Sequence, residues 1–192
     1  MGRNYKYLIG GTVVIIAILI LAIVLVVNNS SSPSTSQNYT RPLASYASNP
    51  TTTVSMLIDG PETGPVNHNQ AIIKVNNQSI SITIYRGYND QVVKQESYSN
   101  SIASFHVFLR SLEFANYPLF TNNPNLGQAS GVCPTGDRYI FETQINNQIT
   151  ERAWTTSCSG LPQTFLGNFS IVFQQFTAQI PNYLNYTTNY NF

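Results

Sequence analysis

An uninterrupted apolar run is the feature that most constrains this chain. Residues 8–27 carry no charge and consist only of Leu, Ile, Val, Ala, Gly and Thr. As a helix these twenty residues would rise about 30 Å, which is the thickness of the hydrocarbon core of a bilayer. The run therefore predicts a single transmembrane helix.

The flanking charges predict how this helix is oriented. Arg3 and Lys6 precede the run, and no charge follows it until Arg41. Short basic flanks stay in the cytoplasm, so residues 1–7 are expected inside and the rest of the chain outside, in a single-pass cell-membrane protein. The run is longer than the apolar core of a signal peptide and lacks a small-x-small site at its end. We expect an uncleaved signal anchor, with cleavage as the alternative.

Composition divides the remaining chain into three parts. Residues 28–53 are mostly Ser, Thr, Asn and Pro, which bury too little apolar surface to offset chain entropy, so a disordered stalk is expected. Residues 54–182 are long enough for one domain with its own core. Residues 183–192 are predicted to form a tail.

The periodicity of residues 54–182 predicts an α+β fold. Ile80, Ile82 and Ile84 alternate with Ser81 and Thr83, as a half-buried strand requires. Apolar residues at helical spacing predict helices over 102–115, after Ser99 or Ser101 as N-cap, and over 165–176. The expected architecture is an antiparallel sheet of five to six strands with two helices on one face; the predicted strands are 54–58, 71–75, 80–85, 92–98, 139–145 and 149–155.

An Asn-Asn-Gln turn occurs twice, at residues 76–78 and 146–148. Each lies between two predicted strands and precedes a predicted helix. A duplicated hairpin-and-helix unit would give this pattern, and so would chance in a chain rich in asparagine. The sequence leaves both readings open.

The two cysteines bracket the second hairpin. With Asn146-Asn147 as its turn, Cys158 lies opposite position 135, within one cross-strand diagonal of Cys133. Disulfides persist outside the cytoplasm, so a structural bond between Cys133 and Cys158 is predicted.

Charge is scarce, which limits the classes of partner. Charged residues make up 9% of the chain, and without Arg3 and Lys6 there are seven basic and eight acidic residues. No basic patch is available for phosphates, so nucleic acid is excluded as an expected partner. A neutral surface rich in amides and tyrosines suits a surface or envelope protein, or a glycan.

No motif for catalysis, a cofactor or a metal is found. The nucleophile elbow, the Walker loop, the dinucleotide fingerprint and the zinc-protease motif are absent. His106 is expected on a helix surface and His68 in a loop, while Asp59 and Glu62 are explained by turn formation. Trp154 is expected to pack beside the disulfide. We therefore predict no catalytic, cofactor-binding or metal-binding residues.

Short stretches resemble two groups of proteins. The anchor, the Ser/Thr stalk and the small Cys-paired domain are similar to exported proteins of small-genome bacteria. The order of elements is similar to emfourin-type protease inhibitors, which implies inhibitory activity without assigning any residue to it. The stretches that carry this second likeness are 59–64, 108–114, 137–139 and 162–176.

The leading hypothesis is a membrane-anchored extracytoplasmic domain without catalytic activity, which binds protein or glycan or serves envelope structure. The alternatives are a membrane-tethered protease inhibitor and an enzyme with an unrecognised site.

Overall fold

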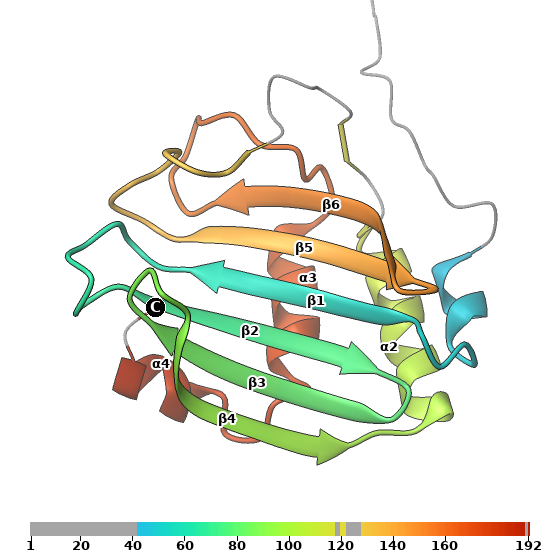
Figure 1. Ribbon diagram of the computed structural model, residues 1–192. Coiled ribbons are helices and arrows are strands. Elements are labelled where there is room, and N and C mark those ends of the chain that lie inside the picture. The colour runs from blue at the N-terminus through green and yellow to red at the C-terminus, as the bar shows by residue number, and fades with distance from the viewer. Residues whose placement is uncertain (1–41, 118–119, 122–127, 191) are drawn as a thin grey trace, which may run out of the picture. The chain divides into compact units, whose positions relative to one another are not determined.

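A six-stranded antiparallel sheet carries three α-helices on one of its faces (Figure 1). The computed structural model describes residues 42–117, 120–121, 128–190 and 192. The strand order is β4-β3-β2-β1-β5-β6 and every neighbouring pair is antiparallel, as the α+β prediction requires. The strands are β1 (Thr53–Asp59), β2 (Asn69–Asn76), β3 (Ser79–Arg86), β4 (Gln91–Ser99), β5 (Arg138–Ile145) and β6 (Gln148–Thr156). The helices are the 3₁₀-helix η1 (Leu43–Tyr46), α2 (Ile102–Phe114), α3 (Phe169–Thr177) and α4 (Leu184–Tyr190).

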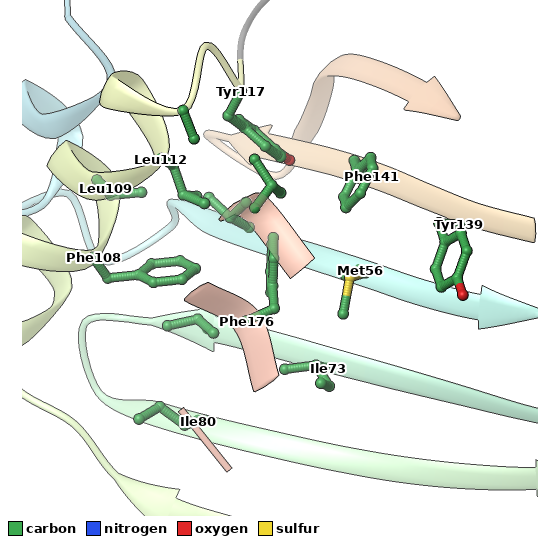
Figure 2. Close-up of a cluster of buried hydrophobic side chains, with 14 of the residues drawn as sticks. Met56, Ile73, Ile80, Phe108, Leu109, Leu112, Tyr117, Tyr139, Phe141 and Phe176 are labelled. Atoms are coloured by element: carbon green, nitrogen blue, oxygen red, sulfur yellow. The ribbon is translucent and has the colours of Figure 1, made fainter. Parts of the chain in front are cut away.

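The core lies between the sheet and the helices. Side chains alternate along β1, so that Val54, Met56 and Ile58 are buried towards the helices while the intervening residues face the other way. Phe108 of α2 meets Phe176 of α3 edge to face, with ring centroids 5.3 Å apart. Figure 2 shows these two rings next to the side chains of Met56, Ile73 and Ile80 from the sheet. Such burial is the main stabilising contribution to a domain of this size.

The predicted strands and helices are confirmed with small shifts at their ends. Ser101 caps α2, because its side chain accepts a hydrogen bond from the backbone N–H of Ser104. The second helix begins at Phe169 and not at 165, because Asn168 caps it and Phe165 lies in a bridge to Phe120.

Two of the expected boundaries differ in the structure. The stalk was predicted to reach residue 53, but η1 packs on α2: Leu43 and Ala44 are buried, and the backbone N–H of Ala44 donates to Glu113 Oε1 at 3.0 Å. The predicted tail contains α4, whose Tyr186 is buried. Both segments are polar on average, and a few apolar side chains at helical spacing are enough to dock them on the core.

The apolar run 8–27 and residues 28–41 of the predicted stalk lie outside the described residues. Within the described residues, no helix combines the length and apolarity that a membrane crossing needs.

The sheet face without helices is partly covered by loops. Leu57, Ile140 and Trp154 occupy adjacent strands on this face, and Ala129 and Val132 of the loop before β5 pack over them. Trp154 therefore belongs to a small second cluster and not to the main core.

Candidate binding groove

A polar groove lies between the edge strand β4 and helix α4, on the helix side of the sheet. Lys94 and Glu96 pair with Ile84 and Ile82, whose side chains are in the core, so both charged residues point to that side. Next to β4, at the edge of the sheet, these side chains line a groove with a volume of 480 Å³. Its walls are Lys94, Glu96 and Tyr98 of β4 and, from the C-terminal segment, Pro181, Asn182, Asn185, Tyr186, Asn189 and Tyr190.

A chain of hydrogen bonds runs across the groove. Lys94 Nζ lies 2.7 Å from Glu96 Oε1, and the Tyr98 hydroxyl donates to Glu96 Oε2 at 2.5 Å. The hydroxyls of Tyr98 and Tyr186 are 3.2 Å apart, which links β4 to α4. Because the only lysine and the only glutamate of the groove are paired, its walls carry no net charge.

The network shifts the titration of its members. Hydrogen bonds from Lys94, then from Tyr98 and Tyr186, lower the pKa of Glu96 to about 2. The hydrogen bond and charge of Glu96 raise the pKa of Lys94, and the hydrogen bond to Glu96 raises that of Tyr98. Burial, followed by the hydrogen bond with Tyr98, raises the pKa of Tyr186. All four groups therefore keep their usual charge states at neutral pH.

The wall formed by the C-terminal segment offers amide groups. Asn182, Asn185 and Asn189 are exposed, and the amide nitrogen of Asn189 donates to the backbone carbonyl of Asn185. The side chains of Asn182 and Asn185 make no hydrogen bond to other described residues, so their donors and acceptors are free for a ligand. The groove can thus bind by hydrogen bonds and tyrosine contacts.

A second polar cluster lies at one end of the open sheet face, around Arg138. The guanidinium is buried and donates three bonds: Nε to Asp59 Oδ2 at 2.8 Å, one terminal nitrogen to Glu62 Oε1 at 2.6 Å and the other to the Gly60 carbonyl at 3.0 Å. Gln70 Nε2 also donates to Asp59, at 2.8 Å. A buried charge needs partners, and two partners of Arg138, Glu62 and Gly60, lie in the β1–β2 loop. The cluster therefore holds this loop against β5.

His68 completes this cluster and is not simply a loop residue. Its ring is buried and stacks on Tyr88 with centroids 4.2 Å apart. Nδ1 lies 3.0 Å from the Pro61 carbonyl, and Nε2 lies 3.1 Å from Asp59 Oδ1 without hydrogen-bond geometry. The Tyr88 hydroxyl donates to the Thr63 carbonyl at 2.8 Å, so both rings hold the β1–β2 loop.

The other residues considered from the sequence lie apart from both clusters. His106 is exposed on α2. Cys133 and Cys158 form the predicted disulfide, with Cα atoms 5.8 Å apart. Among the residues that the structure describes, no three His, Cys, Asp or Glu side chains are placed to hold a metal ion.

Sequence reasoning missed both assemblies. Neighbouring turn residues were enough to account for Asp59 and Glu62 in the sequence. Arg138, which binds both carboxylates, is more than seventy positions away from either of them. For the groove there was a usable signal: Tyr183, Tyr186 and Tyr190 recur at spacings of three and four, which is typical of one face of a helix.

Comparisons of the chain with family models, with curated proteins and with solved structures find no match. The likeness to emfourin-type inhibitors therefore stays a hypothesis based on four short stretches.

Proposed function

We propose that this chain is a non-catalytic binding protein that takes a neutral, hydroxyl-rich ligand, a glycan, in the groove between β4 and α4. The observation that carries the proposal is the charge-neutral wall of free amides and tyrosines around a volume of 480 Å³. Ligand sites of soluble proteins have volumes of roughly 300–1,000 Å³ and few, fixed polar groups.

The chemistry of the groove suits a saccharide better than a charged ligand. Each sugar hydroxyl both donates and accepts, as does each free amide of Asn182 and Asn185. Tyrosine rings present an apolar face with a polar tip, which matches the C–H face and the hydroxyl rim of a pyranose. The Lys94–Glu96 pair leaves the groove without a net charge that would favour an anionic or a cationic ligand.

Other features support a position outside the cell membrane. The run 8–27 would anchor the chain, and the basic residues before it would keep the N-terminus in the cytoplasm. The disulfide between Cys133 and Cys158 suits an oxidising compartment. We propose a single-pass protein that displays its binding domain on the outer side.

The binding proposal is tested with the full chain in detergent micelles. Titration calorimetry would compare neutral oligosaccharides with uronic-acid oligosaccharides of the same length. We expect binding of a neutral oligosaccharide, and a loss of at least tenfold in affinity in Asn185→Ala, whose amide lines the groove. Asn67→Ala is the matched control, because Asn67 is an exposed asparagine in the β1–β2 loop, outside the groove.

Equal losses in the two asparagine variants, or binding of the acidic series alone, would contradict the assignment. Inhibition of a metallo- or serine protease by the same preparation, without saccharide binding, would replace it with the inhibitor hypothesis.

A further inference from the structure

Strand β4 has an unpaired outer edge. It is the last strand of the sheet (Figure 1), and no described backbone group bonds to the side of β4 that faces away from β3. The opposite edge is different. There the N–H groups of Thr164 and Phe165 donate to the carbonyl of Trp154, and the Thr164 hydroxyl accepts from the Trp154 N–H, so a loop covers part of β6. An uncovered edge of nine residues is a template for another strand.

We propose that β4 pairs antiparallel with β4 of a second copy of this chain, about a two-fold axis through Gln95. The strand contains one lysine and one glutamate, Lys94 and Glu96. Only an axis at Gln95 places Lys94 of each copy directly opposite Glu96 of the other. An axis at Lys94 or at Glu96 would instead set like charges against each other.

The direction of the side chains agrees with this register. Lys94 and Glu96 both face the helix side, because they pair with Ile84 and Ile82. In antiparallel strands, residues directly opposite share a face, with Cβ atoms about 5 Å apart. The lysines and glutamates of the two copies would therefore meet on one face, as two opposite-charge pairs. Gln95, opposite its own symmetry mate, lies on the open face beside Thr83.

The two charge pairs lie in the regular part of β4. The register shift against β3 falls between the partners of Ile84 and Tyr85, so that Lys94–Ser99 run regularly and Val93 is the extra residue. Residues 94–96 of the two copies therefore pair with each other in regular strand, and residues 97–99 meet residues 91–93, which contain the bulge. One strand pairing buries less than the roughly 1,200 Å² of a standard interface, so the dimer is weak in dilute solution. Confinement of two copies to one membrane would raise their effective concentration.

Cysteine crosslinking of the full chain in membranes tests this register. Cys133 and Cys158 are already bonded to each other, so Gln95→Cys supplies a single free thiol per chain. Opposite residues of antiparallel strands lie within disulfide reach. We expect a disulfide-linked dimer of Gln95→Cys on non-reducing gels. Ser97→Cys is the matched control: it is exposed on the same face but lies opposite Val93 of the second copy, and it should crosslink at least tenfold less.

Charge variants in the Gln95→Cys background separate this pairing from random collision. Lys94→Glu turns both opposite-charge pairs into like-charge pairs, and about a tenfold loss of crosslinking is expected. Adding Glu96→Lys restores opposite charges and should restore the dimer. The proposal is overturned if Gln95→Cys stays monomeric, or if Ser97→Cys crosslinks as much as Gln95→Cys does. It is also overturned if the charge variants crosslink as much as Gln95→Cys alone. The fluorescence of buried Trp154 checks that each variant is folded.

Discussion

The substitution Arg138→Met removes the residue that joins Asp59, Glu62 and the Gly60 carbonyl. Only 3% of the Arg138 side chain is exposed, against 18% for Asp59 and 37% for Glu62. The Asp59 carboxylate would lose a desolvated ionic partner, at about 2–3 kcal/mol. The half-exposed pair with Glu62 adds at most about 0.5 kcal/mol, and the carbonyl left without a donor adds about 1 kcal/mol. We expect the free energy of unfolding to fall by about 4 kcal/mol.

Denaturant unfolding of the full chain in detergent measures this loss, and Trp154 is the probe because it is the only tryptophan and is buried. At roughly 3 °C per kcal/mol for a domain of this size, the melting temperature should fall by about 12 °C. Arg138→Lys keeps the charge but not the planar fork, and should cost about half as much.

A double-mutant cycle with Asp59→Asn tests whether the charge of Asp59 is what requires Arg138. If Arg138 is required because Asp59 is charged, the double variant Arg138→Met/Asp59→Asn must be more stable than the sum of the two losses predicts, by about 1–2 kcal/mol. Strict additivity, or a loss below about 1 kcal/mol in Arg138→Met alone, would show that solvent and not Arg138 compensates the carboxylates.

Four further outcomes are expected. Cys133→Ser and Cys158→Ser should each cost about 3.5 kcal/mol, for a sequence separation of 25 residues, and the double variant no more, because all three remove one crosslink; differential scanning calorimetry would show it. Gly136→Ala should cost about 1–3 kcal/mol by the same measurement, since its Cβ would lie 2.7 Å from Cys133 Sγ; an unchanged melting temperature would contradict this. Glu96, with a pKa of about 2 below the ~4.3 of a free glutamate, should keep its groove contacts from neutral pH to about pH 4 and lose them as the pH falls through 2; an NMR titration midpoint near 4 would refute the network. Protease added to intact cells should cut within residues 28–41 and leave η1 attached to the domain, whereas protection until lysis would reverse the proposed orientation.

The secondary structure of residues 53–177 could be predicted because its signals are local. Alternation along Ile80–Ile84 and the helical spacing of Phe105, Phe108 and Leu112 each identify an element within one or two turns of chain. The disulfide was predictable for a related reason. A hairpin turn at Asn146-Asn147, both with positive φ, fixes which residues of the two strands face each other.

The ends of the domain were harder to predict, since average composition conceals a docking segment. Residues 42–53 contain few large apolar side chains, yet Leu43 reaches the core beside α2. The tyrosines of α4 fall in the predicted tail, residues 183–192, although their spacing is helical. In both segments the stabilising surface belongs to the rest of the domain, and a window of sequence does not contain it.

The sequence by itself determined the strands, the two longer helices, the disulfide and the scarcity of charge. Only the tertiary structure decided that Arg138 joins Asp59 to Glu62, and that β4 and α4 enclose a neutral groove. The physical reason is the range of the interactions. Periodicity and turns act between neighbours in the chain, whereas the partners of a buried charge and the two walls of a groove come from segments that meet only when the sheet and its helices have packed.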